Sequence, residues 1–349
     1  MAPHSRVTTI TPGWPGQPYW LACPPLTTQK ECDVLGGGAA GFAAQCSEPE
    51  ADTQEVLSSL LLGCASSNSC LYVDVGCNMG YFAAQAAALG AAVDCFEPTP
   101  FFVEAARATW TRNGFSRASN ITRAAVVAPS AFQQARREAI GSSPQPTIHL
   151  RSAYLPCSVG ERDKKALERA KAPGEAPGWD APLVGIRSIL NGRSITMLKV
   201  DIDSVEGSLL HEATRMLSAG QTAIQSILIE LGDPKSAWAH CYQDWCNASR
   251  PMTNPRGGDV SDLYVLQRQL GFDIYRVNIH VNREILTWRG ENANARMSPP
   301  QPHWEQLHSV RSMRKLELLR RDTPREAFPT LLRASQSLLI TKERLLTVG

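Results

Sequence analysis

The strongest constraint on the fold is a regular alternation of short apolar runs and helix-like segments that begins at residue 71. Segment 71–76 is apolar and β-branched and ends in glycine, and the alanine-rich segment 81–89 stops at Gly90. The first pattern is typical of a buried strand, and the second of a helix with a glycine C-cap. A second strand at 91–97 then has to run parallel to the first, because the helix supplies the crossover connection that parallel neighbours need.

The alternation continues along the chain and sets the fold class. Strands are predicted at 71–76, 91–97, 121–127, 194–203, 223–230, 272–277 and 284–288, and helices at 81–89, 100–113, 206–218 and 261–270. Only six residues separate the last two strands, too few for a crossover, so this pair is antiparallel. The sequence therefore predicts an α/β fold with a doubly wound, mostly parallel seven-stranded sheet and a terminal antiparallel hairpin. Rossmann-like class I methyltransferases have this architecture, whereas dinucleotide-binding Rossmann domains end differently.

The chain divides into three parts by pattern. Residues 1–69 form an N-terminal arm, rich in Pro, Gly and Thr at its start, with a short helix at 52–62. The predicted catalytic domain covers 70–290, with an insertion at about 128–193. Residues 291–349 are predicted to be a helical extension, because apolar residues recur every three positions among basic ones across 303–321.

Composition and charge exclude several classes of protein. Hydrophobic residues make up 43% of the 349 positions and charged residues 19%, which excludes disorder over most of the chain. The net charge of +2 gives no reason to expect a nucleic-acid partner. Since no apolar run approaches the ~18–20 residues of a membrane helix, no membrane span is expected. The first twenty residues show no signal peptide, which favours the cytoplasm over a secretory lumen.

Ten cysteines leave three interpretations open. Without a visible secretory signal, free thiols are favoured over disulfides. Cys77 and Cys95 fall in or beside apolar runs, where a thiol behaves as a small buried hydrophobe. Zinc is disfavoured, because no C-x2-C spacing occurs.

The segment YVDVGCNMGYF (72–82) carries the first chemical signal. Its spacing is Asp74-x-Gly76-x-x-x-Gly80, at the carboxyl end of a strand and before a helix, where doubly wound sheets bind ligands. A dinucleotide site would show G-x-G-x-x-G and place helix amides against a pyrophosphate. A carboxylate at this turn opposes a pyrophosphate and instead favours S-adenosylmethionine, which carries a cationic sulfonium. A purely structural glycine turn is the alternative.

Glu97 is the second signal, because it ends the next predicted strand, twenty-one residues after Gly76. An acid in this place accepts hydrogen bonds from the two ribose hydroxyls of an adenosine ligand. Both NAD and S-adenosylmethionine satisfy it, so Glu97 indicates an adenosine site without choosing between them.

These residues resemble the FkbM methyltransferase family. The stretches VDVGCNMGYF and FEPTP are similar to that family's D-V-G-x-N-x-G-Y and F-E-P, and LKVDIDSVEGSLL (198–210) is similar to its K-I-D-V-E-G-A-E, with Asp203 and Ser204 departing from the pattern. The resemblance covers about 70–290. It implies methyl transfer from S-adenosylmethionine, usually to a hydroxyl oxygen. The cofactor-binding residues that it implies are Asp74, Gly76, Asn78, Gly80, Tyr81, Glu97 and Pro98.

Catalytic residues are expected at the ends of the fourth and fifth strands, namely Asp201 and Glu230. Asp201 is the candidate general base or acceptor anchor, with a salt bridge to Lys199 as the alternative. Glu206 is equally compatible with a helix-capping role. No metal ligand is predicted: Asp201, Asp203 and Glu230 could together bind Mg²⁺, but the resembled family does not require it.

Three functions follow, of which the first is preferred. It is an S-adenosylmethionine-dependent methyltransferase acting on a hydroxyl of a small molecule, sugar or lipid. The enzyme alternative is an NAD(P)-dependent oxidoreductase, disfavoured by the glycine spacing and the terminal hairpin. The other alternative is a non-catalytic protein that binds an adenosine cofactor, suggested by the variant residues at 203 and 204.

Overall fold

The computed structural model describes residues 7–10, 19–22, 50–62, 64, 69–115, 119–129, 146–151, 178–202, 206–230, 258–277, 304–308, 315–319, 321–322 and 337–342. The chain forms two compact units, unit 1 from Met1 to Gly185 and unit 2 from Ile186 to Gly349. Each unit is described by itself below.

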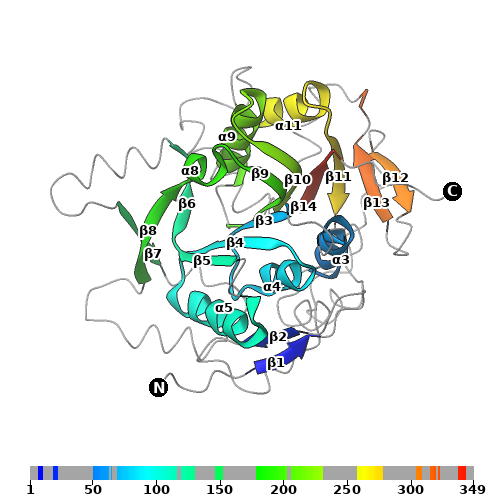
Figure 1. Ribbon diagram of the computed structural model, residues 1–349. Helices are drawn as coiled ribbons and strands as arrows, with labels where there is room; N and C mark the ends of the chain where they lie inside the picture. Colours follow the sequence, from blue (N-terminus) through cyan, green and yellow to red (C-terminus); the bar gives the residue numbers. More distant parts are fainter. Residues whose placement is uncertain are drawn as a thin grey trace, which may run out of the picture. The chain divides into compact units, whose positions relative to one another are not determined.

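Unit 1 contains the start of the predicted strand and helix alternation (Figure 1). Three parallel strands lie in the order β3-β4-β5, with one helix in each connection. The strands are β3 (Leu71–Val75), β4 (Ala92–Glu97) and β5 (Ser119–Arg123), and the helices are α4 (Tyr81–Ala88) and α5 (Pro100–Asn113). The expected bounds are confirmed to within two residues for four of these elements. The segment 121–127 differs, because it holds parts of two strands.

The third predicted strand is split between two sheets. β5 ends at Arg123, and β6 (Ala125–Val127) pairs in parallel with β8 (Gly178–Gly185). β8 also pairs antiparallel with β7 (Thr147–Arg151), which makes a separate sheet in the order β6-β8-β7. The insertion therefore contributes strands to unit 1. The charged run 161–171 within it lies outside the described residues.

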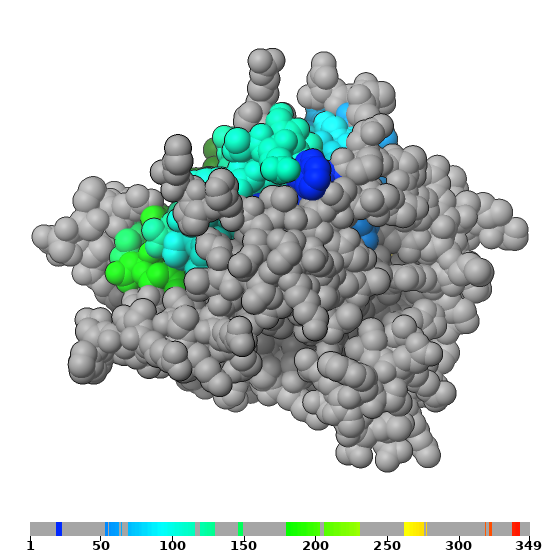
Figure 2. Space-filling view, turned by 90° about the horizontal axis from the view of Figure 1, so that it is seen from below, coloured from blue at the N-terminus to red at the C-terminus, as the bar shows by residue number. Residues whose placement is uncertain are grey.

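The N-terminal arm contributes a hairpin that packs on α5. β1 (Val7–Ile10) and β2 (Tyr19–Ala22) are antiparallel, and the Asn113 side chain donates to the carbonyl of Trp20 and accepts from its amide, at 2.7 and 2.8 Å. Thr109 Oγ1 accepts the Ala22 amide at 2.8 Å. Figure 2 shows residues of this segment, in dark blue, beside the cyan-green surface of α5. The arm also contains α3 (Glu50–Leu61), where the short helix was predicted.

Unit 2 supplies the later strands and helices. Its strands lie in the order β12-β13-β11-β14-β10-β9, and β9 and β10 are parallel. The strands are β9 (Ser194–Val200), β10 (Ala223–Glu230), β11 (Asp273–Val277), β12 (Trp304–His308), β13 (Lys315–Leu319) and β14 (Ser337–Thr341). The helices are α8 (Ile186–Leu190), α9 (Glu206–Ser218) and α11 (Gly258–Arg268).

The antiparallel strand of the sheet comes from a later segment than expected. β14 lies between β10 and β11 and is antiparallel to both, and all five of its residues are buried. The other neighbour of β11 is β13, and the predicted strand 284–288 lies outside the described residues. The helix predicted across 303–321 is wrong, because β12 and β13 occupy parts of it. The described strands after residue 290, β12, β13 and β14, therefore belong to the sheet.

The predicted fold class is confirmed: the protein has a Rossmann-like class I methyltransferase fold. Parallel strands with helical crossovers occur in both units, and an antiparallel strand is inserted between two strands that are parallel to each other. β12 and β13 add two antiparallel strands beyond β11. No helix in the described ranges is long and apolar enough to cross a membrane.

Candidate cofactor site

The turn between β3 and α4 is held to the end of β4 by backbone hydrogen bonds. The amides of Gly76 and Cys77 donate to the carbonyl of Phe96 at 2.9 and 3.3 Å, and the Gly80 amide donates to the Cys77 carbonyl at 2.8 Å. Gly76 and Gly80 both have φ of +83°, in the left-handed region that glycine adopts without steric cost. Asn78 is also left-handed, with φ of +52°, and asparagine is among the side chains that tolerate this conformation.

The remaining amides of the turn donate to side chains. The Asn78 amide donates to Oε2 of Glu97 at 2.9 Å, and the Met79 amide donates to Oδ1 of Asn78 at 2.7 Å. Every backbone N–H from residue 76 to residue 80 therefore has an acceptor within unit 1. A pyrophosphate-binding turn instead presents such amides to its ligand. This turn is not arranged to receive one.

Glu97 is buried and connects the turn to the residues after β4. Its Oε1 accepts the Thr99 amide at 2.9 Å, while Oε2 accepts the Asn78 amide. Burial raises the pKa of Glu97 to about 7 against the opposing effect of these hydrogen bonds, and the Asp74 carboxylate adds a smaller upward shift. The Thr99 side chain also donates to Glu97, and a carboxylate offers about four acceptor positions, so one remains for a hydroxyl of a ligand.

Asp74 lies on β3 and is fully buried. Tyr72 Oη donates to Oδ2 of Asp74 at 3.1 Å, because residues two apart on a strand point to the same face. Asp74 and Glu97 are thus two buried acids beside the same turn, and the negative charge of Asp74 raises the pKa of Glu97. Their mutual repulsion favours a ligand that brings positive charge.

Glycine is required at position 80, because a larger residue would crowd the neighbouring helix α5. A Cβ placed there would lie 3.1 Å from Cβ of Ala106 and 3.2 Å from Cζ3 of Trp110, both on α5. Gly80, predicted to bind the cofactor, therefore also lets the turn pack against α5. Tyr81 follows as the first residue of α4 and is buried, while Pro98 is half-buried.

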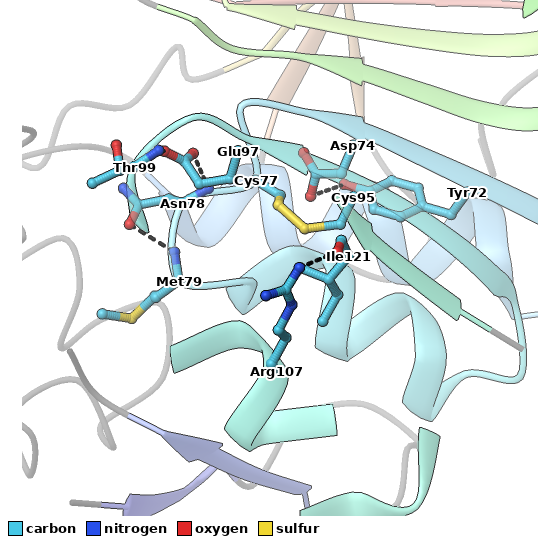
Figure 3. Close-up of a disulfide and its surroundings, with 10 residues drawn as sticks. All are labelled: Tyr72, Asp74, Cys77, Asn78, Met79, Cys95, Glu97, Thr99, Arg107 and Ile121. Atoms are coloured by element: carbon cyan, nitrogen blue, oxygen red, sulfur yellow. Dashed lines mark hydrogen bonds between the residues drawn. A yellow bond between two sulfur atoms is a disulfide. The ribbon is translucent and has the colours of Figure 1, made fainter. Parts of the chain in front are cut away.

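The interpretation of Cys77 and Cys95 as free thiols is wrong. They form a disulfide that joins the turn to β4, with Cα atoms 5.7 Å apart. In Figure 3 the disulfide lies between the Glu97, Asn78 and Thr99 group and the Asp74–Tyr72 pair. A second disulfide joins Cys64 to Cys70, just before β3.

In unit 2, the predicted catalytic acids lie at the ends of β9 and β10. Lys199 Nζ donates to Oδ2 of Asp201 at 2.6 Å, so the salt bridge proposed as the alternative is present. Asp201 also accepts a hydrogen bond from the Glu230 carboxyl group. Burial raises the pKa of Asp201, but the positive charge of Lys199 and the hydrogen bonds from Glu230 and Lys199 outweigh it, so the pKa is lowered overall.

Glu206 lies in the first turn of α9, where an acid suits the helix dipole, and its helix-capping role stays a prediction. It begins α9, is buried, and its Oε1 accepts the amide of Ile202 at 3.1 Å. Asp203 and Ser204 lie outside the described residues. Among the described residues, no group of three or more His, Cys, Asp or Glu side chains could hold a metal ion.

Sequence reasoning missed the roles of four residues of the site, Thr99, Tyr72, Cys77 and Cys95. Thr99 and Tyr72 have no motif that marks them, since each acts through a hydrogen bond to a neighbouring acid. The Cys77–Cys95 pair had a signal, because the two strands were expected to be parallel neighbours and both cysteines fall near their carboxyl ends. The expectation of free thiols rested on the missing signal peptide and on the apolar runs alone.

Comparisons with known proteins found structural likeness only. No family model matches the chain, and no curated protein matches it. The bifunctional kinase-methyltransferase WbdD shows 13% identity and a TM-score of 0.34 over 88% of this chain and 43% of WbdD, so the chain spans less than half of that protein. An O-methyltransferase from Bacillus cereus, in complex with SAH, shows 11% identity and a TM-score of 0.31 over 91% of this chain and 93% of that one.

These TM-scores lie below 0.5, so the fold assignment rests on the strand order and pairing. Membership of the FkbM family stays a prediction, since no family model matches.

Proposed function

We propose that this protein is an S-adenosylmethionine-dependent methyltransferase of FkbM type. The observation that carries the proposal is the turn after β3, whose five amides all donate to protein acceptors while two buried acids lie beside it. That arrangement disfavours the pyrophosphate of a nicotinamide cofactor. It suits an adenosine ligand whose other end is cationic.

The residues fit S-adenosylmethionine in two respects. Glu97 has one acceptor position left for a ribose hydroxyl, and the acids Asp74 and Glu97 favour the positive charge of the ligand. When bound, the cofactor supplies a methyl group already activated by the sulfonium. The protein then has to hold the acceptor oxygen in line with that methyl and accept its proton.

For the acceptor we propose a hydroxyl of a small molecule, sugar or lipid, with Asp201 and Glu230 as the carboxyl groups that bind it. The lowered pKa of Asp201 makes this carboxylate a weak base but a good hydrogen-bond acceptor at neutral pH. Its primary role in this proposal is therefore to orient the hydroxyl, and Lys199 keeps it ionised.

Calorimetry tests the cofactor assignment directly. The purified chain should bind S-adenosylhomocysteine and S-adenosylmethionine with micromolar or tighter affinity, and NAD and NADP should give no measurable heat. Binding of NAD in preference to S-adenosylhomocysteine would establish the oxidoreductase alternative.

Turnover separates a methyltransferase from a non-catalytic binding protein. Labelled S-adenosylmethionine is incubated with the protein and fractionated cell extract, and label is sought in a product stable to mild base. Methyl ethers survive base, whereas methyl esters do not, so this step excludes transfer to a carboxylate. Mass spectrometry of the product then distinguishes a methyl ether from an N-, S- or C-methyl group. Cofactor binding without transfer to any fraction would favour the non-catalytic protein.

A further inference from the structure

We propose that the Cys77–Cys95 disulfide positions the cofactor turn, so that S-adenosylmethionine binds tightly to the oxidised protein and more weakly after reduction. The inference rests on the proposed function, because it concerns the affinity of the same site. Two cysteines thus act on the cofactor through the residues they hold, without contacting it themselves.

The disulfide lies where the turn has to be held in place. Cys77 is the second residue of the turn, directly before Asn78, and Cys95 lies two residues before Glu97 on β4. The link therefore joins the same two segments as the hydrogen bond from the Asn78 amide to Glu97. Cys77 also donates its own amide to the carbonyl of Phe96, the residue that follows Cys95.

The turn needs such a restraint because its backbone is unusual. Three of its five residues, Gly76, Asn78 and Gly80, have left-handed φ values. Glycine in an unrestrained chain visits many other conformations, so the closed turn is one of several states open to it. A cross-link removes most of the alternatives and raises the fraction of molecules whose turn is ready to bind.

The effect on affinity follows from that fraction. The apparent Kd equals the intrinsic Kd divided by the population that is competent to bind. A fall of that population to roughly one tenth on reduction would weaken binding about tenfold. The methyl-transfer step itself should be little changed, because the cofactor meets the same residues once it is bound.

The chemistry is a two-electron reduction by a dithiol. One thiolate of the reductant attacks a disulfide sulfur and releases the first protein thiol, which leaves a mixed disulfide. The second thiol of the reductant then attacks this mixed disulfide and releases the second protein thiol, and the reductant becomes a cyclic disulfide. Cys95 has no exposed surface and Cys77 is 5% exposed, so attack requires the turn to open. A bound ligand that favours the closed turn should therefore slow reduction.

The experiment compares the purified full chain in two redox states. Wild-type protein is measured as isolated and after dithiothreitol, and alkylation with mass spectrometry reports which cysteines are free. Affinity for S-adenosylhomocysteine is measured by calorimetry, KM and kcat by turnover, and folding by circular dichroism. The matched control is Cys64→Ser with Cys70→Ser, which removes the disulfide outside the turn. Cys77→Ala with Cys95→Ala removes the Cys77–Cys95 disulfide itself.

We expect the Kd for S-adenosylhomocysteine to be about tenfold higher in reduced wild type and in the Cys77→Ala, Cys95→Ala variant. Reoxidation of the wild type should restore the original Kd. KM for S-adenosylmethionine should rise with kcat nearly unchanged, the Ser pair should retain wild-type affinity, and S-adenosylhomocysteine should slow reduction of the 77–95 bond. Equal affinity in both redox states, with only a lower melting temperature, would overturn the inference but leave the proposed function standing. Free thiols at both positions in the isolated protein would also overturn it. Failure of the folded, oxidised protein to bind S-adenosylhomocysteine would instead overturn the proposed function.

Discussion

Glu97 is the residue at which burial and ligand binding compete. Because burial raises its pKa to about 7, the native state holds a proton on this carboxyl group between pH 4.5 and 7 that the unfolded chain has released. The contribution of Glu97 to folding stability therefore falls as pH rises through this window. Ribose hydroxyls donate to the ionised form, so cofactor affinity should change with pH in the opposite direction.

We expect the affinity for S-adenosylhomocysteine to be roughly tenfold higher at pH 8 than at pH 6, the ratio of ionised Glu97 for a pKa of about 7. Calorimetry at both pH values, in buffers of different ionisation enthalpy, should also detect proton release on binding at pH 6. Glu97→Gln should bind more weakly and lose the pH dependence. Asp94→Asn, on the same strand, should retain it, and an unchanged profile in Glu97→Gln would assign the titration to another group.

Asp201 gives the second prediction at the residue scale. Asp201→Asn should lower kcat/KM for the acceptor by about ten- to a hundredfold, the range for losing a hydrogen bond to a charged group. Cofactor affinity should stay within twofold. Because the buried Lys199 loses its ion-pair partner, the melting temperature should also fall.

A matched acid separates these two effects. Glu212 on α9 is a buried carboxylate paired with Arg187 and Arg215 in the same unit. Glu212→Gln should lower the melting temperature without lowering turnover per folded molecule. If Asp201→Asn behaves in the same way, Asp201 serves stability alone.

At the scale of elements, β14 determines which segment of the chain is needed to fold unit 2. It lies between β10 and β11, and its five residues are buried. Ser226 Oγ and Thr341 Oγ1 also form a buried hydrogen bond of 2.8 Å between β10 and β14. Removing the strand would expose edges of two neighbouring strands.

A chain that stops after residue 336 should therefore lack a cooperative thermal transition and should aggregate, because two unpaired apolar edges become exposed. A chain that stops after 342 keeps β14 and should melt as the full chain does. Circular dichroism and size-exclusion chromatography of both chains provide the measurement. A cooperative transition in the shorter chain would show that β14 is dispensable.

For the molecule as a whole, local sequence patterns predicted helices and strands well, but they predicted less well which strands pair with each other. The helices α4, α5 and α9 were predicted correctly, because the spacing of apolar residues and the glycine that ends a helix are local signals. The turn residues and Glu97 lie together as expected, because their spacing is fixed by the βαβ unit, while their role in binding a cofactor stays a prediction. β14 was missed because pairing between distant segments leaves no local pattern in the sequence. β12 and β13 were missed for another reason: apolar residues recur every three positions across 303–321, as they do in a helix.

The insertion of β14 has a consequence for how the chain folds during synthesis. β11 ends at Val277 and β14 begins at Ser337, about 60 residues later, so a ribosome makes both neighbours of β14 well before β14 itself. Until then β10 and β11 each have an open apolar edge and no correct partner for it. Such edges pair with other chains readily, and contacts between distant segments form slowly. A nascent chain paused at about residue 330 is therefore the species for which a chaperone matters most.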